Sequence, residues 1–452
     1  MRRALAAAAA IACAACNSAP PSIAIALRVP AGDSPLALAD GVTLSLRAAD
    51  GSVRAVRSVP STASSIALDG VPPGAGYVAE LDATLGPDVV ARGRSCRFDL
   101  AAGQPPPTVS IYFARVGAFA ATAGPSVART GAAAFAAGNL ALVAGGAASG
   151  TPLASSEQYD PARGTFASGP ALVAARAGAQ AATLPDGATL VFGGAASGAP
   201  GVDVFADGKF APSPSAFPPE LADEASVALG DGRVLVAGGR TEAASPTAGT
   251  IVLSSDGALA EAGGPLVDAR RRHTLTLAAE SRAPLAFAAG GLGAAGPLAS
   301  IETFDPATMS FAQSGAQLAT PRYDHTATLL PDGRVLIAGG LDAAGRPLAS
   351  AEIFDPIKRA VTSAGELKLA RAQHTATLLP SGRVLIAGGV DASGGATAQA
   401  EIFDATLGPE GDFVPTAPMT AARAGHAVVA LCDGTLLFVG GGAGAELYNP
   451  AP

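Results

Sequence analysis

From about residue 116 onward, the chain repeats a pattern of short apolar segments separated by glycine-containing turns. Residues 325–340 read HTATLLPDGRVLIAGG, and residues 374–389 repeat them with one difference. Each unit predicts two apolar strands joined by a tight turn and closed by Gly-Gly, then a Gly/Ala/Ser loop and a third strand such as 351–356. A short fourth strand follows, carrying Phe166, Phe210, Phe311 or Phe413 in four units and Leu259 or Val361 in two others. Gly-Gly pairs begin at 145, 193, 238, 290, 339, 388 and 440.

Seven pairs spaced 45 to 52 residues apart predict seven four-stranded units. The Gly-Gly pairs, the Glu-Ile-Phe-Asp-Pro of 352–356 and the late aromatic resemble kelch repeats, the class that includes the central domain of galactose oxidase. The strand-four Trp usual in that class is replaced here. The resemblance covers about three-quarters of the chain and implies an all-β, seven-bladed propeller over residues 116–452.

The two ends of the repeat region complement each other. The chain ends at 445–450, which matches a third strand with no fourth strand after it, whereas residues 116–124 resemble the fourth strand at 163–169. We therefore expect blade seven to combine strand 116–121 with residues 425–448, because an open ring would leave unpaired strand edges.

Residues 17–115 do not fit the repeat. Seven short segments between Gly, Pro and Asp turns read as strands: 22–29, 42–47, 53–59, 65–68, 77–81, 89–98 and 108–113. They predict a small β-sandwich domain, immunoglobulin-like or transthyretin-like, ahead of the propeller.

The N-terminus resembles an export signal. A basic start at 1–3 and an apolar run at 4–12 precede Cys13 and Cys16, and residues 1–16 read as a bacterial lipoprotein signal with Cys16 lipidated. Cys13 competes for this role, and an ordinary cleaved signal is the alternative. The expected location is the cell envelope, at the outer membrane or cell surface. In such a compartment disulfides persist, and we expect Cys96 and Cys432 to bond, the alternative being two buried thiols.

Composition limits the function classes. A net charge of -8 without a long Lys/Arg cluster disfavours nucleic acid, whose phosphates require a basic face. Four His and four Cys in 452 residues disfavour a dense metal cluster. We expect no metal, no cofactor and no catalytic residue.

The candidate chemistry is periodic, which favours a structural role. Each His follows an Arg by three residues, and each Glu begins a third strand at the same rim: Arg270, His273, Arg322, His325, Arg371, His374, Arg423 and His426, with Glu302, Glu352, Glu401 and Glu446. We expect the histidines to hydrogen-bond across neighbouring blades and the Glu and Arg side chains to pair between blades. The alternative is that Arg and Glu project into the channel mouth and bind an acidic sugar.

Blades one to three differ from the others. They carry Ala132, Ala179 and Glu224 in place of His, and Leu221 replaces the Arg of blade three. This asymmetry is what a binding face requires.

The sequence favours a non-catalytic binding module for an envelope or extracellular protein, because the loops after Gly-Gly are short and poor in aromatic residues for stacking on sugars. The alternative is a carbohydrate-active kelch enzyme or a lectin, similar to bacterial sialic acid mutarotase. A copper oxidase is disfavoured because Cys432 aligns with a hairpin on the face opposite the His rim, while Tyr323 alone lies near a His.

Overall fold

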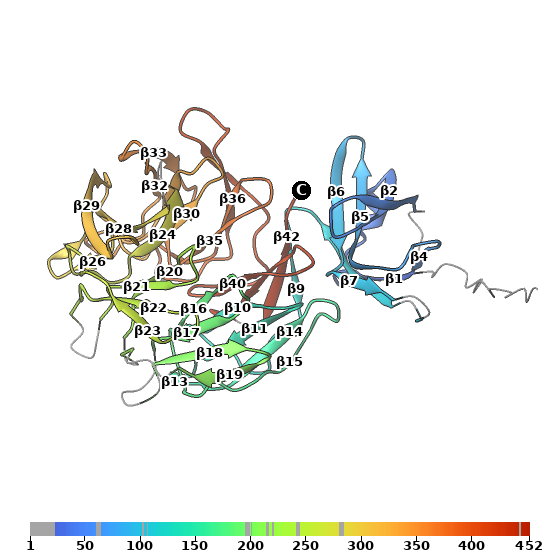
Figure 1. Cartoon of the computed structure of the whole chain (residues 1–452). Helices are drawn as coiled ribbons and strands as arrows, with labels where there is room; N and C mark the ends of the chain where they lie inside the picture. The colour runs from blue at the N-terminus through green and yellow to red at the C-terminus, as the bar shows by residue number, and fades with distance from the viewer. Residues whose placement is uncertain are drawn as a thin grey trace, which may run out of the picture.

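The computed structural model describes residues 23–452 except 60–64, 102–103, 106, 195–198, 200, 214–216, 219–220, 241–244, 280–283 and 443. The predicted lipoprotein signal, with Cys13 and Cys16, lies outside the described residues. The described chain is all-β apart from one 3-10 turn, η1 (Pro35–Leu38), and it contains no helix long and apolar enough to cross a membrane. Figure 1 shows a ring of sheets with a separate small β-domain beside it.

The ring is a seven-bladed β-propeller, as expected. Each blade is a four-stranded antiparallel sheet in which the second strand is almost entirely buried, as in β31 and β36. Blades one to three comprise β10 (Ala133–Ala137), β11 (Leu140–Ala144), β14 (Ser156–Asp160) and β15 (Thr165–Ser168); β16 (Gln180–Thr183), β17 (Thr189–Phe192), β18 (Val202–Ala206) and β19 (Lys209–Pro212); and β20 (Ala225–Ala228), β21 (Val234–Ala237), β22 (Thr250–Leu253) and β23 (Leu259–Ala262).

Blades four to six comprise β24 (Thr274–Ala279), β25 (Pro284–Ala289), β28 (Ser300–Asp305) and β29 (Ser310–Gln317); β30 (Thr326–Leu329), β31 (Val335–Ala338), β32 (Ser350–Asp355) and β33 (Ala360–Glu366); and β35 (Thr375–Leu378), β36 (Val384–Ala387), β38 (Ala400–Asp404) and β39 (Asp412–Pro415). The loops contain three additional sheets, each formed by a pair of two-residue strands: β12 (Ala147–Ala148) with β13 (Thr151–Pro152), β26 (Leu292–Gly293) with β27 (Gly296–Pro297), and β34 (Arg371–Ala372) with β37 (Val390–Asp391).

Blade seven joins both ends of the ring. Strands β40 (Ala427–Ala430), β41 (Leu436–Val439) and β42 (Ala445–Asn449) are completed by β9 (Ala118–Thr122), which pairs antiparallel with β42 and places Phe119 opposite Tyr448. Because β9 precedes blade one in the chain, this sheet closes the ring without a free edge.

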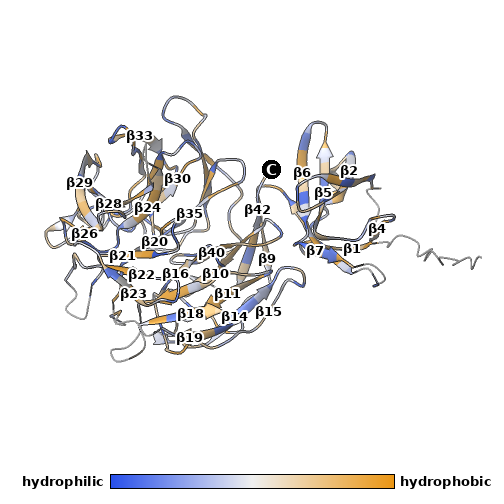
Figure 2. Cartoon of the chain, viewed as in Figure 1, coloured by the Kyte–Doolittle hydropathy of each residue, from blue (hydrophilic) through white to orange (hydrophobic). Residues whose placement is uncertain are grey.

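Apolar side chains fill the space between blades. Ile353, Phe403 and Phe413 of blades five and six share one cluster, and equivalent clusters recur around the ring. Figure 2 shows apolar residues along the inner strands and more polar residues toward the loops.

The first domain is a curled sheet around its own core. It contains β1 (Ile23–Arg28), β2 (Gly41–Arg47), β3 (Val53–Ser58), β4 (Ser65–Leu68), β5 (Gly74–Leu85), β6 (Asp88–Arg94), β7 (Phe98–Leu100) and β8 (Thr108–Arg115). Seven of the strands lie where the sequence predicted them, and β7 is an additional one. They form one continuous sheet in the order β3-β2-β5-β6-β8-β1-β4, with β7 against β5. A parallel pairing of β1 with β8 connects the halves that a sandwich would keep as separate sheets.

The domains share an apolar contact and a covalent link. Tyr112 and Ala114 of β8 pack in one cluster with Val429 and Leu437 of blade seven. Cys96 and Cys432 form a disulfide with a Cα–Cα distance of 4.9 Å across 336 residues of sequence. Together these contacts attach the first domain to the blade that closes the ring.

Candidate functional site

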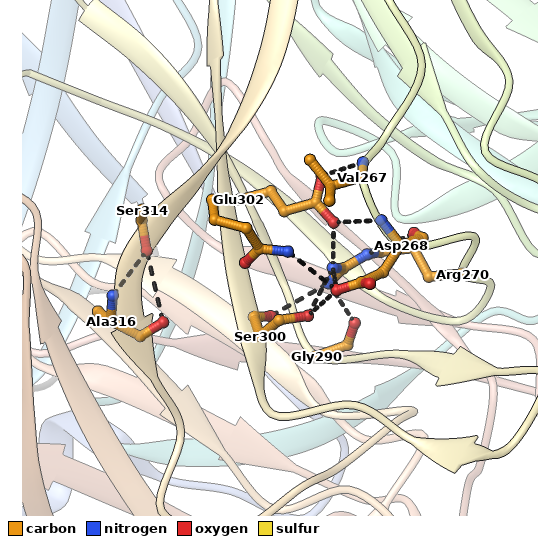
Figure 3. Close-up of polar contacts among 9 residues, drawn as sticks. Val267, Asp268, Arg270, Gly290, Ser300, Glu302, Ser314 and Ala316 are labelled. Carbon is orange, nitrogen blue, oxygen red and sulfur yellow. Dashed lines mark hydrogen bonds and ion pairs between the residues drawn. The ribbon is translucent and has the colours of Figure 1, made fainter.

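The loops on one face of the propeller are held by a buried arginine beneath them. In blade four, the Arg270 Nη1 donates to the backbone oxygens of Gly290 (2.7 Å) and Ser300 (3.1 Å), and its Nη2 donates to Glu302 Oε1 (2.5 Å). The same Glu302 carboxylate accepts hydrogen bonds from the backbone N–H groups of Val267 and Asp268 (Figure 3). One ion pair thus fixes the connection entering the blade, the Gly-Gly turn and the third strand.

Six blades carry this buried ion pair. The arginines rank among the largest fully buried side chains, and each donates to the first glycine carbonyl of its own Gly-Gly turn. The pairs are Arg129–Glu157, Arg176–Asp203, Arg270–Glu302, Arg322–Glu352, Arg371–Glu401 and Arg423–Glu446. The arginines of blades one and two and the Asp of blade two were not predicted from the sequence, although Arg129 and Arg176 lie three residues before Ala132 and Ala179.

The expectation about these residues and its alternative are both wrong. Each pair lies within one repeat rather than between two blades, because the arginine precedes the first strand of the same blade whose third strand carries the carboxylate. The pairs also do not project into the channel mouth: the Arg270 and Glu302 side chains are both 0% exposed. They stabilise the loops and are not available to a sugar.

Three of the four histidines make the expected contacts between blades, whereas both ring nitrogens of His273 are buried without a hydrogen-bond partner among the described residues. His325 Nε2 lies 3.1 Å from the Thr274 hydroxyl of the preceding blade, and His374 and His426 repeat this contact with Thr326 and Thr375 at 2.9 Å. Burial lowers the pKa of His325, His374 and His426 to about 3, so these rings are neutral at pH 7.

The first glycine of each Gly-Gly pair makes room for the next blade. Gly339 has φ +62°, and a Cβ there would lie 2.5 Å from the Arg371 carbonyl oxygen and 2.9 Å from His374 Cε1. Gly388 is in the same position relative to Arg423 and His426. The repeated Gly-Gly therefore follows from blade packing rather than from ligand binding.

A ring of seven left-handed residues lies directly before the His positions. Backbone hydrogen bonds join five of the neighbouring pairs, such as Arg272 N–H to the Asp223 oxygen at 2.8 Å and Gln373 N–H to the Asp324 oxygen at 3.2 Å. All have φ between 53° and 75°: Gly131, Gly178, Asp223, Arg272, Asp324, Gln373 and Gly425. Glycine is the residue this backbone favours, and blades one, two and seven have it.

The other four members, Asp223, Arg272, Asp324 and Gln373, belong to consecutive blades and form what we call the rim arc. Left-handed backbone costs a non-glycine residue on the order of 1 kcal/mol or more, and such positions concentrate at functional sites. The sequence analysis missed the arc. Its only sequence signal is that four residues preceding the His position are polar where three others are Gly.

The rim arc and its neighbours form a charged network. Asp324 accepts from Arg272 Nε (2.6 Å) and from Gln373 Nε2 (3.0 Å), and the Arg272 guanidinium lies over the Tyr323 ring at 5.0 Å. Asp223 Oδ2 accepts from Arg240 Nε (2.7 Å). It also accepts from Arg271 Nη1 (2.9 Å).

Blade three departs from the others beneath the arc. Glu224, in the His position, is 4% exposed, and neither of its carboxyl oxygens has a hydrogen-bond partner. Burial raises its pKa to about 8, so it is uncharged at pH 7. Leu221 and Ile251 occupy the places of the ion pair. The two positions whose N–H groups bind the carboxylate in other blades are Pro218 and Pro219, which have no N–H.

A cleft of about 590 Å³ adjoins the arc between the loops of blades five and six. Gln373 of the arc is one of its walls, together with Leu341, Pro347 and Val390. Asp342, Arg346 and Asp391 supply charge, and Arg346 Nη2 pairs with Asp342 at 2.8 Å. The size lies within the range of ligand pockets.

The described residues contain no group of three or more metal-ligating side chains. Cys432 is bonded to Cys96, so it is not available for the Tyr cross-link of a copper oxidase. No protein-family model matches the chain, and a search of curated proteins found no match either.

Proposed function

We propose that the chain is a non-catalytic protein-interaction module: a kelch-type propeller, exported and attached to the cell envelope through a lipid on Cys16. The propeller fold is compatible with this function, since propellers present broad loop faces to partners.

The rim arc is the observation that supports the proposal. Four consecutive blades retain polar side chains on left-handed backbone where glycine is favoured, and their network remains partly open to solvent, with Arg272 25% and Asp223 29% exposed. A purely structural ring would be served by glycine at all seven positions. The retained side chains therefore point to a partner at this end of the channel.

Two further features favour a protein over a glycan. The aromatic ring nearest the arc, Tyr323, is covered by Arg272, which leaves that face unavailable for stacking on a sugar. The adjoining cleft combines apolar walls with a few charged groups, which matches the composition of a protein interface.

The disulfide supports export. A Cys96–Cys432 bond persists in oxidising compartments and is rare in the cytosol. Together with the signal-like N-terminus, it favours an envelope location. Mass spectrometry of the mature N-terminus, with Cys16→Ala as the comparison, tests the lipid: a diacylglyceryl mass on Cys16 supports anchoring, and an unmodified N-terminus refutes it.

The interaction is tested by photo-crosslinking in cells. A benzophenone amino acid at Gln373 samples the arc, and the same residue at Ser381, in the β35–β36 hairpin of the same blade, samples the opposite face. Capture of one protein repeatedly from Gln373 and not from Ser381 supports the proposal. Equal capture from both faces, or glycan capture at Gln373, contradicts it.

A further inference from the structure

Two guanidinium groups from different loops converge on one carboxylate of the rim arc. Arg240 follows the Gly-Gly turn of blade three, and Arg271 lies in the connection entering blade four. The Nε of Arg240 donates to Asp223 Oδ2 at 2.7 Å, and Nη1 of Arg271 donates to the same oxygen at 2.9 Å. Asp223 thus holds both guanidinium groups within reach of one point.

Most of the donors on these two groups are unused. A guanidinium has five N–H donors, and the contact with Asp223 uses one on each side chain. No other described residue accepts a side-chain hydrogen bond from either group or forms an ion pair with it, except the shared Asp223. Both side chains are partly exposed, Arg240 at 37% and Arg271 at 24%.

The local charge remains positive. Burial alone would raise the pKa of Asp223, but the hydrogen bonds from Arg240 and Arg271 outweigh it and lower that pKa, so the two arginines and Asp223 together carry one net positive charge. The neighbouring Glu224 adds no negative charge at pH 7, since its pKa is about 8. The adjacent pair Arg272–Asp324 is neutral as a unit.

The backbone places this group at an accessible edge. Asp223 has φ +60°, a conformation that directs it into the ring of left-handed residues, and its neighbour in that ring is Gly178, where an added Cβ would meet nothing within 4 Å. Asp223 therefore keeps a strained backbone conformation next to Gly178, a position with free space around it. A ligand can reach the guanidinium pair from solvent, to which both side chains are partly exposed.

We propose that Arg240 and Arg271, positioned by Asp223, bind a carboxylate of the partner protein, either an acidic side chain or a chain terminus. Paired guanidinium donors match carboxylate geometry, and holding them in place before binding reduces the ordering cost. This inference rests on the proposed protein-interaction function and names the group recognised there.

Short blocked peptides test it. Ac-Ala-Glu-Ala-NH2 offers only a side-chain carboxylate, Ac-Ala-Ala-Ala-OH only a terminal one, and Ac-Ala-Gln-Ala-NH2 neither. NMR spectra of arginine Nε–H groups in the full oxidised chain report binding directly. We expect saturable shifts at millimolar peptide with at least one carboxylate peptide and none with the glutamine peptide, and tighter binding of one identifies the source.

Variants locate the site. Arg240→Gln and Arg271→Gln should each weaken the binding at least 10-fold, while Arg346→Gln, which removes another guanidinium from the same face, should leave it unchanged. Unfolding midpoints close to the parent show that each variant is folded, and either arginine variant alone suffices. Unchanged binding in both folded arginine variants, or no shift with either carboxylate peptide, overturns the proposal. Tighter binding of glucuronate than of both peptides also overturns it, in favour of a sugar acid.

The two proposals fail separately. If Gln373 crosslinks capture a protein equally well in the parent and in Arg240→Gln/Arg271→Gln, the interaction function stands and the carboxylate site falls. If carboxylate peptides bind but no protein is captured, the site stands and the protein-interaction function falls.

Discussion

Replacing Glu352 by Ile should destabilise the propeller more strongly than the loss of one hydrogen-bond acceptor suggests. The Glu352 carboxylate accepts from the N–H groups of Ala319 (2.7 Å) and Thr320 (3.1 Å) and from Arg322 Nη2 (2.6 Å). Arg322 is 0% exposed, so the variant leaves a buried cation without its counter-ion. Breaking a buried pair in this way costs about 3–5 kcal/mol.

Blade three supplies the matched control because it lacks the pair naturally. Adding Arg322→Leu to Glu352→Ile removes the buried charge, but two backbone N–H groups stay unpaired at about 1–3 kcal/mol each. Adding Ala319→Pro and Thr320→Pro copies Pro218 and Pro219 and removes those donors as well. We expect the stability order parent, fourfold variant, double variant, single variant.

Urea unfolding of the oxidised full chain at pH 7 measures these differences, with the slope of the transition compared between variants. Hydrogen exchange of the Ala319 and Thr320 amides shows whether the effect is local. A loss below about 1 kcal/mol in Glu352→Ile, the size of an average substitution, would refute this expectation. So would a fourfold variant less stable than the single one.

Four further predictions concern the rest of the chain. Cys96→Ser should lower the free energy of unfolding by roughly 6 kcal/mol in the chain-entropy model for a loop of this length, and reductant should do the same to the parent but not to the variant in urea titrations. Glu224→Gln should stabilise increasingly as pH rises from 4.5 to 8, because the unfolded state ionises Glu224 before the folded state does; a gain independent of pH in urea titrations would contradict this. His374→Gln should reduce the loss of stability as pH falls from 6.5 toward 3, since the unfolded state binds the His374 proton first, and an unchanged pH profile of unfolding would count against it. Gly425→Ala should cost about 1 kcal/mol in thermal unfolding, because φ is +59° and an added Cβ meets no atom within 4 Å, so strain alone acts; a neutral result would remove the strain argument for the rim arc.

Repetition explains why much of the propeller was predictable. A pattern that occurs seven times identifies the strands even where a single copy would be ambiguous. The third strand at 445–450 needed a fourth strand from residues near 116, and β9 provides it. The cross-blade role of the histidines followed from the same logic, because a residue that recurs once per blade is more often part of the packing. The curled sheet of the first domain could not be predicted in this way, because its sequence does not repeat. The parallel pairing of β1 with β8 joins segments about 80 residues apart, and the pattern of a strand does not specify its partner.

The candidate site was harder to predict because it depends on geometry that appears only in the ring. Asp223 and Arg271 are 48 residues apart, and Arg240 reaches the same oxygen from a third segment. The left-handed backbone of the rim arc is likewise set by hydrogen bonds between blades, which no local pattern of residues specifies.

Blade three folds without the buried ion pair that the other six blades contain. The buried ion pair is not indispensable there, because prolines eliminate the two N–H groups that need a carboxylate and Leu221 fills the arginine's place with apolar volume. No buried arginine occupies the ion-pair position of that blade. The guanidinium groups of Arg240 and Arg271 pair with Asp223 instead, where they remain partly exposed. The same blade carries the unpaired Glu224. Blade three thus lacks both the internal ion pair and the histidine, and it has exposed charge at the channel mouth. Folding explains its residues less well than those of the other blades. Binding should therefore be sought there first.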